Sequence, residues 1–245
     1  MQGHKIEAVI VNHNTSRYVE LALRSLFAHH PRELNVSLRV FDNASTDDMS
    51  ELIAYLASRG LSIEQTGFTT DSENNSHGEI LSRFVLDHPD CTHYLFLDAD
   101  VCFIEENTIG TMLDELEDRS DVFGIAPRMS WDGVEEIPEE VWRKNRDIYD
   151  ARLHPCCALV KNTALFRRIV KEIGLSSVKY LWAESDEILD TFKLMTKVMK
   201  THGLKHIISS KMVLHFFCVS YTWEPTKQWN EVKAKRRDRL LSIYR

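Results

Sequence analysis

The stretch HYLFLDADVCF, residues 93–103, decides how the chain is interpreted. Its apolar run, typical of a buried strand, ends abruptly at Asp98-Ala99-Asp100. Two carboxylates one residue apart at the end of a buried strand repel each other and lose hydration, which is costly. A divalent cation removes that repulsion, and Mg²⁺ or Mn²⁺ leaves positions free for water and phosphate oxygens. The alternative is a pair of solvated loop aspartates that cap the next helix.

Outward from this stretch, apolar strands alternate with amphipathic helices. Residues 5–14 and 36–41 are expected to be strands. The segments after them, 16–29 and 46–60, have the apolar spacing of helices, the second with Thr46 as candidate N-cap. Further strands are predicted at 61–65, 93–100 and 121–127, and further helices at 79–88 and 107–118. This repetition predicts an α/β fold with a mainly parallel central sheet flanked by helices.

The second half of the chain is less regular. The expected elements there are a strand and a helix over 156–174, a helix over 183–203 and a strand over 212–221. No Pro- or Gly-rich linker separates two domains. We therefore expect one domain in two halves, 1–127 and 128–225, followed by a basic helix over 226–245.

Composition narrows the class of protein. The 245 residues are 43% hydrophobic and 27% charged, which is typical of a globular domain, and the net charge of −7 argues against a nucleic-acid partner. The five cysteines lack zinc-site spacing, which indicates reduced thiols. No signal-peptide pattern is found, and no apolar run approaches the roughly 20 residues that a membrane helix needs. The expected location is the cytoplasm.

Polar clusters end three of the predicted strands. They are Asn12-His13-Asn14, Asp42-Asn43 and Asp98-Ala99-Asp100. Because ligands of open α/β sheets bind outside the carboxyl ends of the strands, we expect these clusters to line one crevice. The glycine patterns of a Rossmann dinucleotide site and of a P-loop are absent from the sequence.

Three segments, in this order, resemble the family-2 glycosyltransferases of the GT-A fold: VIVNHNTSRYVELALRSL (9–26), VFDNASTDDM (40–49) and YLFLDADV (94–101). The resemblance implies a metal-dependent, inverting transfer of a sugar from a nucleotide-diphosphate donor. The acceptor would be a glycan, a lipid-linked molecule or a small molecule. The half 1–127 would bind the nucleotide sugar, and the half 128–225 would face the acceptor.

The same resemblance implies roles in donor binding. Asp42 would accept a hydrogen bond from the nucleotide base, and Asp98 would face the ribose. Asp100 would ligate the Mn²⁺ or Mg²⁺ that bridges the diphosphate. The remaining donor-site residues by resemblance are Val11, Asn12 and His13 around the base, Ala99 beside Asp98, and His77 where the family closes over the donor. The sequence leaves open that His13 is a surface histidine and His77 an ordinary loop residue.

Inverting transfer needs a general base, for which a carboxylate near the acceptor is the expected group. In WAESDEILDT (182–191), Asp186 is the first candidate and Asp190 the second. Their spacing would place both on one face of the predicted helix. The alternative is favourable charge at the N-terminus of a solvated helix.

His215 resembles a late histidine that contributes to the metal site of many GT-A enzymes, and imidazole is a suitable third ligand for Mn²⁺. The alternative is a core histidine satisfied by hydrogen bonds. His154, Cys156 and Cys157 occupy the position of the acceptor-side strand, where small core residues are the simpler interpretation of the two cysteines.

The segment from Pro225 to Arg245 holds seven basic and two acidic residues. This charge, with its apolar residues, fits a helix in peripheral contact with the inner face of an anionic membrane, which would suit a lipid-linked acceptor. The alternative is a solvated helix docked on the domain by its apolar side chains.

Two other functions stay open. A sugar nucleotidyltransferase would need a phosphate loop rich in glycine and basic residues, which VNHNTSRYVE (11–20) does not provide. A GT-A domain that binds nucleotide sugar as a scaffold, without catalysis, would not need Asp42, Asp98 and Asp100 together.

Overall fold

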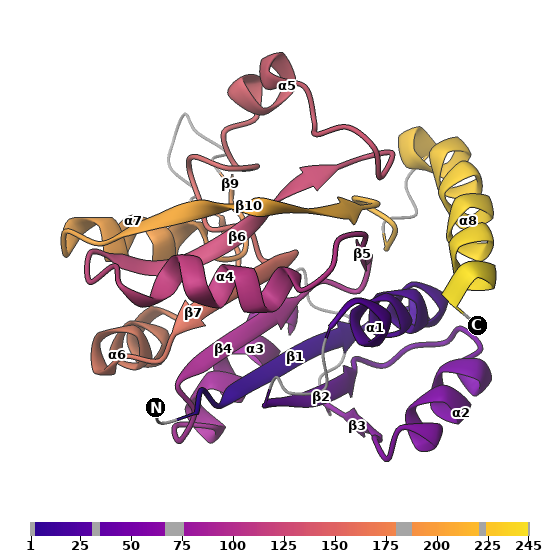
Figure 1. Cartoon of the computed structure of the whole chain (residues 1–245), viewed down its shortest axis with the longest axis horizontal. Coiled ribbons are helices and arrows are strands. Elements are labelled where there is room, and N and C mark those ends of the chain that lie inside the picture. The colour runs from indigo at the N-terminus through magenta and orange to yellow at the C-terminus, as the bar shows by residue number, and fades with distance from the viewer. Residues whose placement is uncertain (1–2, 31–34, 67–75, 180–187, 221–223, 245) are drawn as a thin grey trace.

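The computed structural model describes residues 3–30, 35–66, 76–179, 188–220 and 224–244. Within these ranges the chain forms an eight-stranded sheet in the order β3-β2-β1-β4-β7-β6-β10-β5 and a two-stranded sheet, β8-β9 (Figure 1). The strands are β1 (Ile6–Asn12), β2 (Val36–Asp42), β3 (Ile63–Gln65), β4 (His93–Leu97), β5 (Val101–Phe103), β6 (Val122–Ser130), β7 (Cys157–Lys161), β8 (Val178–Lys179), β9 (Ile188–Leu189) and β10 (Lys205–His215). The helices are α1 (Ser16–His29), α2 (Ser50–Ser58), α3 (Ser76–Asp87), α4 (Thr108–Glu117), α5 (Glu139–Lys144), α6 (Ala164–Ile173), α7 (Lys193–Thr201) and α8 (Glu224–Tyr244).

The large sheet is mixed. Its first four strands, β3, β2, β1 and β4, are parallel, as the alternation of strands and helices predicts. Strand β7 enters between β4 and β6 and runs antiparallel to both, and β5 is antiparallel to β10. The predicted halves 1–127 and 128–225 therefore share one hydrogen-bonded sheet.

Helices cover both faces of this sheet. All seven residues of β1 are buried, as expected for a near-continuous apolar strand. Because successive side chains point to opposite faces, Ile10 packs with residues of α1, α2 and α4, whereas Val9 packs with residues of α3, α6 and α7. In β4, Leu97 packs in the same cluster as Ile10, and Phe96 packs in the same cluster as Val9. The polar residues after β1 and β4 thus emerge at an edge between two filled cores.

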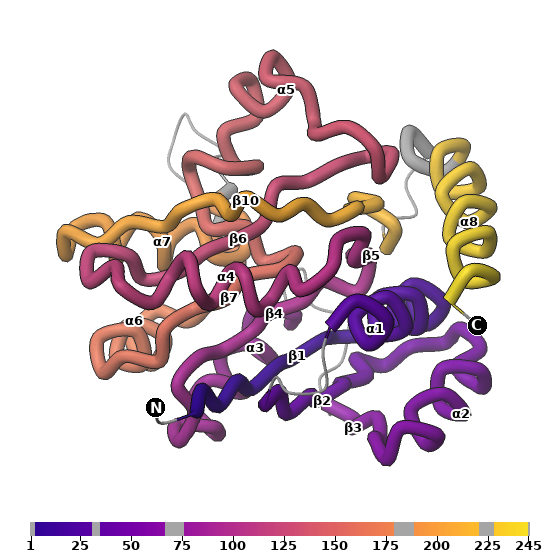
Figure 2. Tube along the Cα trace, viewed as in Figure 1, coloured from indigo at the N-terminus to yellow at the C-terminus, as the bar shows by residue number. Residues whose placement is uncertain are grey.

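Helix α8 lies beside α1, although the two are far apart in the sequence (Figure 2). The Arg237 guanidinium lies 4.7 Å from the ring centroid of Tyr18, and Tyr244 Oη donates to the Phe103 carbonyl at 3.2 Å. Lys233 Nζ donates to the carbonyl of Phe217, two residues after β10. Several polar side chains of this helix therefore contact its own domain. None of the described helices is long and apolar enough to cross a membrane.

The helix expected to begin near Thr46 begins instead at Ser50, so that prediction of an N-cap is wrong. The Thr46 backbone N–H and Oγ1 donate to Asn14 Oδ1 at 2.7 and 3.1 Å. These bonds hold the start of the segment as a loop over the end of β1, a role that propensity alone does not reveal.

The helix expected over 183–203 begins only at Lys193. Residues Ile188–Leu189 pair with β8 instead, and Phe192 has a φ of +70°, which breaks a helix. Asp190 therefore precedes α7, so the argument that Asp186 and Asp190 share a helix face is wrong for Asp190. Asp186 lies outside the described residues.

The strand expected over 212–221 is β10, which begins earlier and ends at His215. Phe217 and Cys218 follow with φ values of 54° and 53°, which no strand can accommodate. The chain therefore turns sharply just after His215.

Candidate active site

A pocket of about 490 Å³ opens at the carboxyl ends of β1 and β4. Its lining includes His13 after β1, the segment Asp98–Asp100 after β4, and His215 at the end of β10. The second half of the chain, 128–225, adds Arg152 and Asp190. Asn43, which follows β2, also lines the pocket, so each of the three strand-end clusters contributes at least one residue to one crevice, as expected.

Asp98, Asp100 and His215 form a tight group in this pocket. His215 Nε2 lies 3.1 Å from Asp100 Oδ1 and 3.9 Å from Asp98 Oδ2. One ligand atom from each of the three side chains lies within 4.8 Å of the other two. Burial raises the pKa of the Asp98 carboxyl, which Asp100 also raises, whereas His77 and His215 lower it. The two carboxyl groups therefore lie together where water is partly excluded, an environment that disfavours the negative charge of Asp98.

Backbone hydrogen bonds from three strands hold this group. The Asp98 N–H donates to the Cys156 carbonyl, next to β7, at 3.0 Å, and the Phe216 N–H donates to the Asp100 carbonyl at 3.0 Å. Residues 101–103 then continue as β5, which pairs with the end of β10. The two aspartates are thus tied to β7 on one side and to His215 on the other.

The side chains fit a divalent cation. His215 is 4% exposed, and its Nδ1 is buried without a hydrogen-bond partner among the described atoms. If a cation lay between His215 Nε2 and Asp100, the ring proton would sit on Nδ1. Without a cation, a proton on Nε2 would be donated to Asp100. Two carboxylates and one imidazole suit Mn²⁺, and the carboxylates suit Mg²⁺.

His77 is at the second residue of α3, with its Nε2 4.0 Å from Asp98 Oδ1. His13 also lines the pocket, with Nδ1 2.8 Å from the Asn43 carbonyl oxygen. Val11 and Ala99 are further lining residues. Both histidines whose roles the sequence left open therefore line the pocket that holds Asp98 and Asp100.

Asn12 and Asp42 are fully buried and hold two loops together. Asn12 Nδ2 donates to Asp42 Oδ1 at 2.9 Å, and Asn12 Oδ1 accepts from the Thr15 N–H at 3.2 Å. Neither side chain is among the lining residues of the pocket. Their described contacts position the loop that carries His13.

Arg152 is a pocket residue that the sequence did not single out. It is 7% exposed, and its Nη1 lies 2.9 Å from Asp190 Oδ2. It falls in an irregular segment without strand or helix periodicity, so no pattern marks it as buried. Asp190, the second candidate base, therefore reaches the pocket as half of an ion pair.

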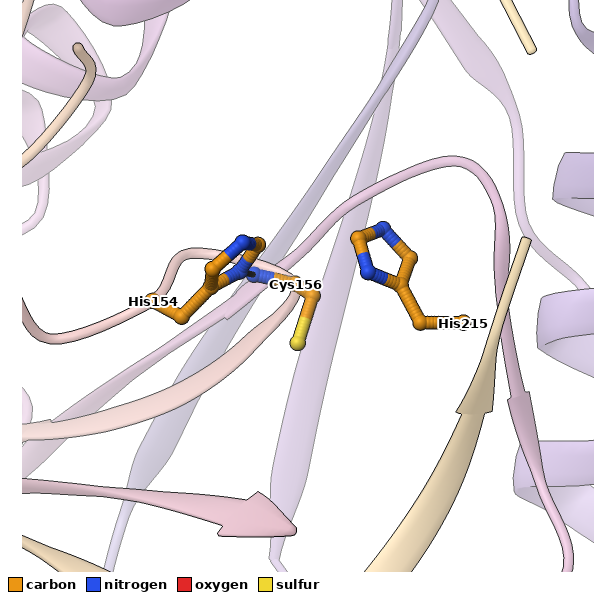
Figure 3. A group of neighbouring side chains, drawn as sticks. All are labelled: His154, Cys156 and His215. Atoms are coloured by element: carbon orange, nitrogen blue, oxygen red, sulfur yellow. Dashed lines mark hydrogen bonds between the residues drawn. The ribbon is translucent and has the colours of Figure 1, made fainter. Parts of the chain in front are cut away.

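A second group, His154, Cys156 and His215, lies beside the aspartates (Figure 3). Both ring nitrogens of His154 face N–H donors, the backbone of Cys156 at 3.1 Å and Arg152 Nη2 at 3.3 Å. Burial raises the pKa of the Cys156 thiol well above its usual value, which disfavours the thiolate that metals bind. We therefore assign Cys156 to packing behind the pocket, as preferred for the cysteines from sequence, whereas His154 is one of the lining residues.

Comparisons with known proteins bear on the fold. No family model matches the chain, and no curated protein matches it in sequence. Mannosyltransferase PcManGT from Pyrobaculum calidifontis, solved with GDP-Man and Mn²⁺, matches with a TM-score of 0.61 and 14% identity over 97% of this chain and 62% of its own. For S. aureus TarS 1-349 the TM-score is 0.55, with 14% identity over 98% of this chain and 70% of that one.

Glucosyl-3-phosphoglycerate synthase from Mycobacterium tuberculosis, solved with phosphoglyceric acid, has a TM-score of 0.55 and 16% identity over 98% of this chain and 80% of its own. At such identities the likeness shows the fold alone. The chain has the GT-A-type fold of these proteins, as the sequence resemblance implied.

Proposed function

We propose that this chain is a metal-dependent glycosyltransferase that moves a hexosyl or related group from a nucleotide-diphosphate donor to an acceptor, with inversion. One observation carries the proposal: Asp98 and Asp100 lie 3.9 and 3.1 Å from His215 in a pocket at the carboxyl ends of parallel strands. Solved neighbours with GDP-Man and Mn²⁺, or with UDP-Glc and Mn²⁺, support this chemistry for the same fold.

Asp100 and His215, with Asp98 beside them, are proposed to hold Mn²⁺ or Mg²⁺. When bound, the cation supplies the positive charge that stabilises a departing diphosphate. The chain's own contribution is to hold the carboxylate oxygens and the imidazole nitrogen in place before substrate arrives, so that little reorganisation accompanies the reaction.

The donor nucleoside is proposed to lie against Val11, His13 and Ala99, with Asp98 toward the ribose and His77 beside it. For Asp42 we keep a hydrogen bond to the base as the proposed role, although its Oδ1 already accepts from Asn12. Whether or not Asp42 binds the base, Asn12 and Asp42 hold in place the loop that contains His13.

The proposed base is a carboxylate that takes the acceptor proton as the leaving diphosphate departs from the opposite face of the sugar. Asp190 lines the pocket, and Asp186, the other candidate, lies outside the described residues. If Asp186→Asn and Asp190→Asn both keep full turnover, neither residue is the base.

Binding and chemistry need separate experiments. Thermal shift with UDP, GDP and dTDP, each with and without Mn²⁺, should find one nucleotide whose stabilisation requires the metal. Donor hydrolysis or transfer, measured over a panel of nucleotide sugars, should then be lost in Asp100→Ala. Binding without any turnover would instead indicate a scaffold, and no metal-dependent binding would refute the proposal.

We also propose that the acceptor is a glycan, a lipid-linked molecule or a small molecule, met in the cytoplasm or at the inner membrane face. Support for a membrane contact is limited to exposed Trp229, Val232 and Ile243 of α8, interspersed with Lys235 and Arg239. Sedimentation with anionic vesicles should pull down the chain, and less of Trp229→Ser. If the wild-type chain does not sediment with the vesicles, the contact is refuted, and equal recovery of the two proteins would refute the role of Trp229 in it.

A further inference from the structure

Among the described residues that line the pocket, Arg152 is the one lysine or arginine. The side chain is 9% exposed, in a pocket that also holds Asp98, Asp100 and Asp190. A buried guanidinium is costly without anionic or carbonyl partners, so its position calls for an explanation.

Main-chain carbonyls hold this guanidinium. Nη1 donates to the Thr191 carbonyl at 2.8 Å, and Nε donates to the Asp147 carbonyl at 3.3 Å. Nη2 lies 3.3 Å from His154 Nε2, and His154 in turn packs with its ring centroid 5.3 Å from that of His215. Arg152 is thus fixed by the fold itself, next to His154.

Its anionic partner is held less firmly. Asp190 Oδ2 lies 2.9 Å from Arg152 Nη1, but the Asp190 side chain is 50% exposed, against 9% for that of Arg152. The other oxygen, Oδ1, accepts from the N–H of Thr191 at 2.8 Å. A half-exposed carboxylate can leave the ion pair and be rehydrated, whereas the buried guanidinium cannot.

We propose that Arg152 is an anion-binding residue of this pocket, covered by Asp190 when the pocket is empty, and that a phosphate or carboxylate group of the acceptor takes the place of Asp190. A guanidinium pairs with either group through two parallel N–H bonds. The inference rests on the proposed function in one respect only, which is that the molecule bearing the phosphate or carboxylate is taken to be the acceptor.

The acceptor is favoured over the donor diphosphate by position. Arg152 contacts His154 and Asp190 and belongs to the half proposed to face the acceptor, whereas Asp98 and Asp100 belong to the half proposed to bind the donor. An acceptor anion at Arg152 would also release the Asp190 carboxylate from its ion pair.

The test measures binding of inorganic phosphate, and of acetate as a carboxylate probe, to the full chain by titration calorimetry. Asp190→Asn removes the internal competitor and should tighten phosphate binding about five- to tenfold, as expected for one partly exposed ion pair. Arg152→Gln should abolish binding. The matched control is Asp150→Asn, a similarly exposed acid paired with Arg146, which should leave affinity unchanged.

Opposite effects of Asp190→Asn and Arg152→Gln are the signature of a covered anion site. An Asp190→Asn protein that binds phosphate no better than Asp150→Asn would overturn the proposal, as would phosphate binding retained by Arg152→Gln. If Arg152→Gln fails to fold, Arg152→Lys replaces it and should weaken binding at least fivefold, because it loses the paired N–H geometry.

A second titration distinguishes the two sources of anion. Saturating nucleoside diphosphate with Mn²⁺ should leave phosphate binding intact if the site serves the acceptor. Displacement of phosphate by the nucleotide would overturn the assignment to the acceptor. Because phosphate binding requires no sugar transfer, failure of every nucleotide to bind would refute the proposed function and leave the Arg152 site standing.

Discussion

Asp100→Asn should separate the metal's contribution from that of the side chain. Asp100 is 7% exposed and lies 3.1 Å from His215 Nε2. Without metal, the amide removes a like charge from the neighbourhood of Asp98 and can still accept a hydrogen bond from His215. Since the lost charge-assisted bond is worth about 1.5–3 kcal/mol and the relieved repulsion offsets part of it, we expect the metal-free unfolding free energy to change by only about 1 kcal/mol.

With Mn²⁺ the two proteins should diverge. A cation at one hundred times its dissociation constant stabilises the native state by about 2.7 kcal/mol. For a chain of this size that is a rise in Tm of about 5–10 °C. Wild type should show this rise, and Asp100→Asn should lose most of it.

The assay is thermal unfolding followed by circular dichroism, with and without Mn²⁺. Asp87→Asn, which alters an exposed ion pair with Arg83, is the control and should behave as wild type. An Asp100→Asn protein with an undiminished Mn²⁺-dependent rise would refute the role given to this carboxylate.

Three further predictions concern the fold. Gly78→Ala should destabilise the protein by about 2 kcal/mol or more, measured by urea unfolding, because an added Cβ would lie 2.2 Å from the Ser176 Cα. Thr163→Ala should cost about 1 kcal/mol in the same assay, since its side chain accepts from the Phe166 N–H at the start of α6; no change would disprove the cap. Burial lowers the pKa of His93 to about 4. The unfolded chain therefore binds more protons than the native one between about pH 6.5 and 4, so unfolding free energy should fall as pH falls through that range. The fall should be smaller in His93→Asn, and an identical pH profile would contradict the assignment.

The first half of the fold could be predicted because its signals are local. Near-continuous apolar runs such as that of β1 predict strands covered on both faces, and polar residues at their ends mark the ligand edge. Boundaries failed where tertiary bonds override propensity. Thr46 donates a hydrogen bond to Asn14 and does not cap α2. The segment before α7 forms strand β9, which pairs with β8.

The candidate site was only partly predictable. Asp98 and Asp100 could be named because they end a predicted buried strand within a segment that resembles the family, and His215 because it resembles a late histidine of GT-A enzymes. Arg152 could not, since its burial depends on carbonyls of Asp147 and Thr191 that no sequence pattern brings together. The ion pair between Arg152 and Asp190 could not be predicted for the same reason.

The pairing of β5 with β10 has a consequence for biosynthesis. Residues 101–103 leave the ribosome directly after Asp100, but their sheet partner, residues 213–215, emerges about a hundred residues later. At about 5–20 residues per second, that gap lasts roughly 5–20 seconds. During this interval Asp98 and Asp100 have emerged without the imidazole of His215, so the pocket can be completed only after residue 215 has left the ribosome.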